Sequence, residues 1–291
     1  MNLQSDTPRS VKEREEEIAS LLARVQPLLD REPALVEVAG RVAYAGDTHG
    51  DVGTTRAVLS RYGGFDRIVF LGDYVDREPE PGWSLDNVLT LLQAKLDDPE
   101  RIVLLKGNHE ANAIIPCFPC EFNREVTLEY GPGLADRFDE VFRAFPVMTR
   151  GHRVFAAHGG FPIDATLGEL RSASKTDRSL LEAVLWSDPA VSKTFRGVGS
   201  LFTEDELLRF LTRIDASVFL RSHDYQRLGE SIYDDHCLTI FSARQYQTRG
   251  NRGILAASTD HDITRASELC LEDYASGVWR PYQMVVVEDQ F

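Results

Sequence analysis

The sequence has little cysteine, no long apolar run and no excess of positive charge. Its 291 residues include four cysteines, too few and too scattered for the disulfide framework of a small secreted domain. No uncharged apolar run reaches the roughly 18 residues that a membrane-spanning helix needs, and residues 1–17 contain no apolar signal region. We therefore expect a cytoplasmic protein with no membrane partner.

The charge balance argues against polyanionic partners. Lys and Arg number 32 against 46 Asp and Glu, so the formal net charge is -14. Such a surface repels nucleic acid, although it leaves room for a local basic pocket. Hydrophobic residues make up 43% and charged residues 27% of the chain, which is near the average for soluble globular proteins and predicts a sizeable core.

Cys117 and Cys120 form a single CxxC pair. The spacing is that of half a structural zinc site, or of a redox pair. Because no second pair and no nearby Cys or His partner accompanies it in the sequence, we expect ordinary reduced thiols and leave the zinc and redox interpretations open.

Short apolar runs alternate with helical patterns in the first half of the chain. Residues 41–45, 67–71 and 101–105 are β-branched or apolar runs that predict buried strands. Helical patterns at residues 54–62 and 84–96 separate them, which indicates a β-α-β-α-β unit with a parallel sheet. The pattern is helical from residue 109 to 145. A second sheet is predicted from further runs at residues 153–157, 217–220, 237–241, 253–258 and 282–287.

The N-terminal segment predicts an amphipathic helix. Ser10 and Glu13 have the spacing of a capping box, and apolar residues from Ile18 to Leu29 then fall on one helical face before Pro33. We favour packing of this face on the main body over binding to a partner, because such stripes usually face a core.

Polar motifs follow four of the predicted strands. They read GDTHGD at residues 46–51, GDYVDR at 72–77, GNHE at 107–110 and HGG at 158–160. In open α/β sheets ligands bind beyond the carboxyl ends of the strands, so these loops should converge. Carboxylate and amide oxygens mixed with imidazole suit manganese, iron or zinc. We therefore expect a metal site there.

These motifs, in this order, resemble those of the phosphoprotein phosphatase family of serine/threonine phosphatases, which are calcineurin-like metallophosphoesterases. The resemblance covers roughly residues 41–260 and includes LWSDP, FRGV, RSHD and FSARQY. It implies an α/β fold in which two β-sheets pack as a central sandwich flanked by helices. We accordingly divide the chain into an N-terminal helical extension, residues 1–36, and a catalytic domain, residues 37–291.

The resemblance also implies the ligands of two divalent metal ions, with manganese favoured and iron or zinc also suitable. Asp47 and His49 would hold one ion and Asp73 would bridge both, while the second would be held by Asn108, His158 and His223. A shared carboxylate offsets the repulsion of two cations about 3.5–4 Å apart, and a bridging water becomes acidic enough to supply hydroxide. No covalent phosphoenzyme is then required.

Further roles follow from the same resemblance. His109 would protonate the leaving oxygen, and Asp76 would orient His109 and favour its protonated form. Arg77 and Arg196 would bind the phosphate oxygens, because a planar guanidinium makes paired hydrogen bonds to them. Asn108 and Tyr246 would line the same pocket. Arg244 stands where the family commonly has proline, and we hypothesise that it adds positive charge near the phosphate.

The implied function is hydrolysis of phosphoserine and phosphothreonine in proteins or peptides, with phosphotyrosine not excluded. An alternative is a hydrolase of dinucleoside polyphosphates, because such enzymes share the metal motifs. A non-enzymatic binding module is disfavoured, since all the proposed ligands and the acid are present.

Overall fold

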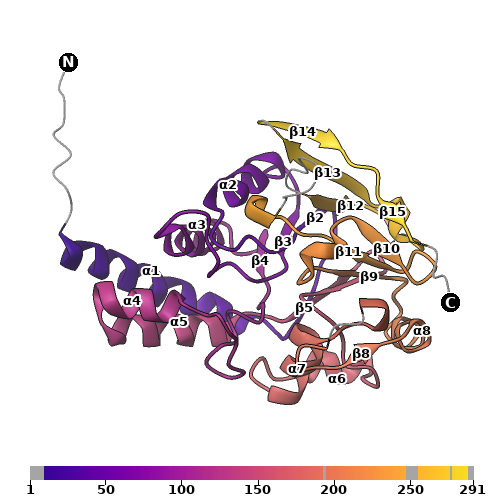
Figure 1. The fold of residues 1–291 in the computed structure, drawn as a ribbon, viewed down its shortest axis with the longest axis horizontal. Coiled ribbons are helices and arrows are strands. Elements are labelled where there is room, and N and C mark those ends of the chain that lie inside the picture. Colours follow the sequence, from indigo (N-terminus) through magenta and orange to yellow (C-terminus); the bar gives the residue numbers. More distant parts are fainter. Residues whose placement is uncertain (1–9, 193–194, 247–254, 276, 288–291) are drawn as a thin grey trace.

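Two β-sheets form the centre of the computed structural model, which describes residues 10–192, 195–246, 255–275 and 277–287 (Figure 1). The first sheet has the order β14-β13-β12-β2-β3-β4. Strands β2, β3 and β4 are parallel, with β4 at the edge, and β12, β13 and β14 join as antiparallel neighbours. In chain order its strands are β2 (Val42–Ala45), β3 (Arg67–Phe70), β4 (Ile102–Leu104), β12 (Ala256–Thr259), β13 (Cys270–Ala275) and β14 (Val278–Pro281).

The second sheet has the order β1-β5-β6-β9-β11-β10-β15 and mixes parallel and antiparallel pairs. Its strands are β1 (Leu35–Glu37), β5 (Met148–Gly151), β6 (Val154–Ala157), β9 (Val218–Arg221), β10 (Glu230–Ile232), β11 (Cys237–Thr239) and β15 (Val285–Val286). A small parallel pair, β7 (Asp188–Pro189) and β8 (Leu201–Phe202), lies apart from both sheets.

Eight α-helices cover the outer faces of the two sheets in the described part of the chain. Helices α1 to α5 lie over the first sheet and α6 to α8 over the second (Figure 1). The helices are α1 (Val11–Arg31), α2 (Val52–Arg61), α3 (Trp83–Asp97), α4 (Phe122–Tyr130), α5 (Pro132–Ala144), α6 (Leu167–Ser172), α7 (Arg178–Trp186) and α8 (Glu204–Arg213).

Side chains alternate between the two faces along each strand, and this alternation creates the layers. In β3, Val69 points into the core between the sheets, whereas Ile68 and Phe70 point toward the helices of the first sheet. In β6, Val154 enters the same inter-sheet core and Phe155 packs against the helices on the other side. Because successive strand residues face opposite sides, strands that are apolar throughout become buried on both faces. The predicted sandwich of two sheets flanked by helices is confirmed.

Helix α1 begins as its sequence predicts. The Ser10 hydroxyl accepts from Glu13 N at 3.2 Å, and the Glu13 carboxylate accepts from Ser10 N at 2.9 Å, which completes a capping box. Its apolar face packs against α3, α4 and α5. Strand β1 then spans the predicted boundary between residues 36 and 37, and the division of the chain at that boundary stays a prediction.

We expect Leu29→Ala to destabilise the protein by about 2–5 kcal/mol, because Leu29 is fully buried where α1 meets the main body and its removal leaves a cavity. Chemical denaturation would measure the change. The control is Leu128→Ala, since Leu128 is 75% exposed and its replacement should change stability by less than about 0.5 kcal/mol. Equal effects of the two substitutions would contradict the packing of α1.

Some sequence predictions need correction. The predicted helical region does not begin at residue 109. Turns and irregular segments extend to residue 121 and α4 starts at Phe122, because Pro116 and Pro119 cannot continue a helix. The strand predicted at residues 282–287 is shortened to Val285–Val286. Seven strands were not predicted: β1, β5, β7, β8, β10, β13 and β14. The start of the strand predicted at residues 253–258 lies outside the described residues. No helix among the described residues is long and apolar enough to cross a membrane.

Candidate metal centre

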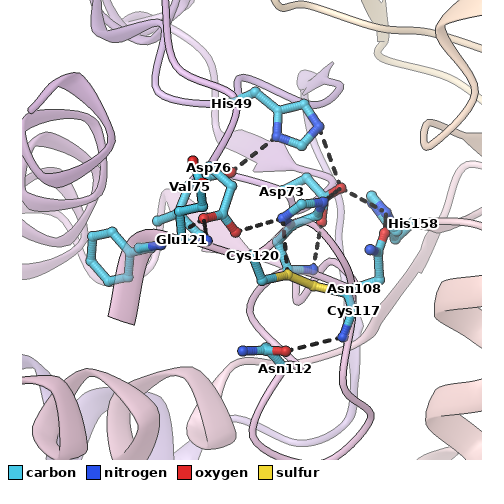
Figure 2. Close-up of a disulfide and its surroundings, with 12 residues drawn as sticks. His49, Asp73, Val75, Asp76, Asn108, Asn112, Cys117, Cys120, Glu121 and His158 are labelled. Carbon is cyan, nitrogen blue, oxygen red and sulfur yellow. Dashed lines mark hydrogen bonds and ion pairs between the residues drawn. A yellow bond between two sulfur atoms is a disulfide. The ribbon is translucent and has the colours of Figure 1, made fainter. Parts of the chain in front are cut away.

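The carboxyl ends of strands from both sheets meet at one place. The loops after β2, β3 and β4 in the first sheet and after β6 and β9 in the second each deliver one or two of the predicted ligands. All of these side chains are buried, and Figure 2 shows His49, Asp73, Asn108 and His158 pointing toward one another. The predicted ligands brought together are Asp47, His49, Asp73, Asn108, His158 and His223.

One group of ligand atoms surrounds His49. Its Nε2 atom lies 3.6 Å from a carboxylate oxygen of Asp47 and 3.6 Å from one of Asp73. Its Nδ1 atom lies 3.0 Å from the carbonyl oxygen of Val75, to which it donates when it carries the proton. That tautomer leaves the lone pair of Nε2 directed at the carboxylates. This buried atom has no hydrogen-bond partner in the part of the chain that the structure describes.

A second group shares Asp73 with the first. His158 Nε2 lies 3.5 Å from the same Asp73 oxygen, 3.0 Å from Asn108 Oδ1 and 3.0 Å from His223 Nδ1. The other nitrogen of His158 lies 3.0 Å from the carbonyl oxygen of Leu71, which holds the ring in place. The two overlapping groups fit a pair of cations bridged by Asp73, because buried carboxylates and orphaned imidazole nitrogens need a positive partner.

The electrostatics favour cation binding. Burial lowers the pKa of His49 to about 3 and that of His223 well below its ordinary value, so both rings are neutral, the form that binds metals. Burial would also lower the pKa of His158, but the carboxylates of Asp73 and Asp47 outweigh it and raise that pKa to about 9. A divalent cation would compete with the proton on His158, because both are attracted by the carboxylates of Asp73 and Asp47.

Backbone strain is concentrated in these loops. Five of the predicted site residues have positive φ angles, a region that residues other than glycine rarely adopt: His49 (40°), Asp73 (53°), Asp76 (64°), Arg77 (56°) and His223 (71°). Such conformations persist only where the surroundings impose them, and they cluster at functional sites.

Glu110, which the motif contains but to which no role was assigned, imposes part of this geometry. Its buried carboxylate accepts hydrogen bonds from the backbone N–H groups of Asp73 (2.8 Å), Tyr74 (2.8 Å) and Gly107 (2.9 Å). It thereby joins the loops after β3 and β4. Gly107 is required here, because a Cβ atom at this position would collide with Asp73.

His109 and Asp76 form a buried pair beside the metal ligands. His109 Nδ1 lies 2.6 Å from Asp76 Oδ2, and His109 Nε2 has no hydrogen-bond partner among the described residues. Burial would lower the pKa of His109, but the negative charges of Asp73 and Asp76 outweigh it and raise the pKa. A protonated His109 would therefore present an N–H from Nε2 to a ligand.

The phosphate-binding residues predicted from sequence line the approach to these ligands. Arg77, Arg196 and His223 share a cavity of about 330 Å³. Tyr246 hydrogen-bonds with Arg77, and its ring lies 5.5 Å from that of His49. The structure thus brings every predicted site residue to one region; their catalytic and binding roles stay predictions.

Asp188, a residue of the LWSDP segment to which no role was assigned, positions Arg196. Its buried carboxylate accepts from Arg196 Nε at 2.7 Å and from Arg221 Nη2 at 2.6 Å. Arg221 in turn donates to the carbonyl of Gly159 at 2.6 Å, beside His158. Because Asp188 binds Arg196 through Nε, the terminal nitrogens of this side chain, which is 30% exposed, can bind an anion.

We expect Arg196→Ala to lower kcat/KM by about 10- to 100-fold, the effect of losing charge-assisted hydrogen bonds worth about 1.5–3 kcal/mol. Inhibition by inorganic phosphate should weaken in parallel. Steady-state kinetics would measure both, with Arg213→Ala on α8 as the control. Unchanged phosphate inhibition would exclude Arg196 from the anion site.

The hypothesis for Arg244 is not supported by its contacts. The Arg244 guanidinium pairs with the buried carboxylate of Asp51, with Nε 2.6 Å from Oδ2. Its charge is therefore balanced at the start of α2. The next residue, Gln245, donates to the carbonyl oxygens of His49 (2.9 Å) and Arg77 (3.2 Å). Arg244 anchors the segment that carries Tyr246.

The prediction of reduced thiols at Cys117 and Cys120 is wrong. The two residues form a disulfide with their Cα atoms 5.9 Å apart, a separation that suits such a bond (Figure 2). The turns between residues 110 and 121 bring the two side chains together, which spacing alone does not decide. Cys237 and Cys270 are free thiols.

Comparison with known proteins agrees with this geometry. The model of the calcineurin-like phosphoesterase family matches residues 40–227. The serine/threonine-protein phosphatase 4 catalytic subunit of Kluyveromyces lactis is 32% identical over 265 residues, which are 86% of this chain and 84% of that protein. The subunit of the same name from Saccharomyces cerevisiae is 31% identical, with the same coverage.

Solved structures share the fold. A serine/threonine phosphatase of Saccharomyces cerevisiae, described as similar to human phosphatase PP5, superposes with a TM-score of 0.77 at 23% identity, covering 90% of each chain. A cold-active protein-tyrosine phosphatase of a psychrophilic Shewanella gives 0.63 at 17% identity, covering 88% of this chain and 84% of that one. By motif, fold and sequence identity, this chain belongs to the calcineurin-like phosphoesterase family and is related to the serine/threonine-protein phosphatases.

Proposed function

We propose that this protein is a metal-dependent protein phosphatase that hydrolyses phosphoserine and phosphothreonine, with phosphotyrosine as a further candidate substrate. The observation that best supports this proposal is that two buried groups of ligands share Asp73. They lie beside a cavity lined by Arg77 and Arg196. The named relatives support phosphorylated proteins or peptides as substrates. A cytoplasmic location also stays a prediction.

The proposed cofactors are two divalent metal ions, with manganese favoured and iron or zinc as alternatives. Asp47 and His49 would hold one, Asn108, His158 and His223 the other, and Asp73 both. The donor set of carboxylate, amide and imidazole fits these metals. When bound, such ions acidify a water molecule and neutralise charge on phosphate oxygens.

The remaining residues would act on the substrate. Arg77 and Arg196, with Asn108 and Tyr246, orient the phosphate so that a water oxygen attacks phosphorus in line with the serine or threonine oxygen. As the new P–O bond forms and the old one breaks, His109 Nε2 gives its proton to the departing oxygen. Asp76 holds His109 at Nδ1 and favours its charged form. No covalent phosphoenzyme is needed.

A screen of substrates against metals tests this proposal. Turnover of phosphoserine, phosphothreonine and phosphotyrosine peptides and of diadenosine tetraphosphate would be measured with manganese, iron, zinc and a chelator. We expect metal-dependent release of phosphate from the peptides. Faster cleavage of diadenosine tetraphosphate would favour the alternative function, hydrolysis of dinucleoside polyphosphates, and absence of turnover on every substrate would overturn the enzymatic proposal.

A further inference from the structure

The Cys117–Cys120 disulfide lies directly against the His109–Asp76 pair. Cys120 Sγ is 3.6 Å from His109 Nδ1, the atom that also lies 2.6 Å from Asp76 Oδ2. The residues are eight or more positions beyond His109 in sequence, so this contact is created by the turns of the loop. The function proposed above assigns no role to this bond.

The chain that leaves the disulfide holds Asp76 from its other side. The backbone N–H groups of Glu121 and Phe122 donate to Asp76 Oδ1 at 2.6 and 2.7 Å, while Oδ2 faces His109. At the opposite end of the small ring, Cys117 N donates to Asn112 Oδ1 at 3.0 Å. The disulfide therefore closes a loop that is anchored to Asp76 at one end and to Asn112 at the other.

The loop is also accessible from solvent. Phe118, between the two cysteines, is 94% exposed, and both cysteines are only half-buried. A protein dithiol can therefore approach the bond, which a fully buried disulfide would prevent. Of the two free cysteines, Cys237 is buried and Cys270 is exposed at the start of β13. Cys117 and Cys120 are thus the candidate redox site, and Cys270 provides a control.

We propose that Cys117 and Cys120 form a reversible redox site. In the disulfide state the protein has its full hydrolytic activity, and in the dithiol state this activity is lower. The proposal rests on the proposed function, in which His109 donates a proton. Its partner is a dithiol reductant of the thioredoxin class, and a small-molecule disulfide serves as the oxidant for the return step.

The exchange is balanced. A partner thiolate attacks one sulfur, the S–S bond breaks and a mixed disulfide forms; the second partner thiolate then releases this protein. Two electrons and two protons arrive at Cys117 and Cys120, and the partner leaves as a disulfide. Reoxidation by the small-molecule disulfide proceeds through the same two kinds of exchange in the opposite direction, so the S–S bond between Cys117 and Cys120 forms again.

Reduction acts on Asp76 through the backbone. Without the covalent link, residues 118–121 gain conformational freedom, so the N–H groups of Glu121 and Phe122 are held less firmly at Asp76. The Cys120 thiol, no longer bonded to Cys117, also becomes a competing hydrogen-bond partner beside His109 Nδ1. The step that becomes slower is the delivery of a proton to the leaving oxygen. Asp76 is thus a positioning residue, controlled by the redox state of its neighbours.

The test compares two substrates across a redox titration. The full-length, manganese-loaded protein would be equilibrated in dithiothreitol buffers of increasing reducing strength, and its thiols counted by alkylation and mass measurement. We expect kcat on a phosphoserine peptide to fall by about 10-fold, part of the 10²- to 10⁴-fold that a general acid contributes, and the midpoint of this fall should coincide with the midpoint of thiol formation. With p-nitrophenyl phosphate, whose leaving group needs no proton, kcat should fall by less than about 3-fold.

Two variants separate the switch from other effects of the reductant. Cys117→Ser combined with Cys120→Ser should show the low, substrate-selective activity in every buffer, whereas Cys270→Ser should respond like the unmodified protein. If the double variant does not fold, as judged by thermal unfolding, the titration of the unmodified protein decides alone.

The outcomes distinguish this proposal from the proposed function. Phosphopeptide turnover that stays constant while the thiols titrate overturns the switch and leaves the phosphatase intact. A response to reductant that persists in the double variant also overturns it, because the reductant would then act elsewhere. Absence of turnover in both redox states overturns the proposed function instead.

Discussion

Asp73→Asn is expected to lower kcat by on the order of 10³-fold or more, a loss of about 4 kcal/mol of transition-state stabilisation. Asp73 is shared by both ligand groups, with one oxygen 3.6 Å from His49 Nε2 and 3.5 Å from His158 Nε2. An amide has no negative charge to offset the repulsion between two cations, so the variant should hold fewer than two ions. Activity and metal content should therefore fall together.

Elemental analysis after manganese loading, combined with steady-state kinetics, measures both effects. Asp235→Asn is a matched control, because Asp235 is also buried and also has a positive φ angle of 64°, but it bonds Ser231 and Ser267 away from the site. Retention of two ions and most of the activity by Asp73→Asn would rule out a bridging role.

His109→Gln is expected to lower kcat on a phosphoserine peptide by about 10²- to 10⁴-fold, the usual contribution of a general acid. The loss should be much smaller with p-nitrophenyl phosphate, because its leaving group departs without a proton. Kinetics with both substrates measures the difference, and His261→Gln, at an exposed histidine, is the control. Equal losses on both substrates would show that His109 does not act as the acid.

The pH dependence follows from the raised pKa of His109. The active form is protonated, so kcat/KM on the phosphoserine peptide should persist above the ordinary pKa of histidine and decline as pH rises through the raised value. Asp76→Asn removes a carboxylate 2.6 Å from the ring, which should move this decline to lower pH. A decline at unchanged pH in Asp76→Asn would contradict the role of Asp76.

Much of the catalytic region could be predicted because its residues follow strands with a strong local signal. The apolar runs before Asp47, Asp73, Asn108 and His158 are read directly as strands, and parallel strands place their carboxyl ends at one edge. His223 follows β9 in the same way, and this strand, like β6 before His158, belongs to the second sheet. Strands β13 and β14 were missed, because their partly exposed, mixed sequences lack a clear alternation.

Contacts between distant segments could not be predicted in this way. Asp188 and Arg221 are 33 residues apart, and nothing in the sequence shows that one carboxylate serves both Arg196 and Arg221. Glu110 stands beside His109 in the motif, yet its three backbone partners are set by how two loops meet. The sequence allowed a role for Arg244 in binding phosphate, but in the structure its guanidinium pairs with the carboxylate of Asp51.

The sequence by itself determined the strands that precede the ligands, the ligand types at their ends and the family to which they belong, because these depend on local hydrophobic pattern and on fixed motifs. Only the tertiary structure decided that Cys117 and Cys120 are joined, that their loop holds Asp76, and that buried partners neutralise Arg244 and orient Arg196. The physical reason is that hydrogen bonds and disulfides depend on distances of a few ångströms between segments, which chain folding sets and local sequence does not encode.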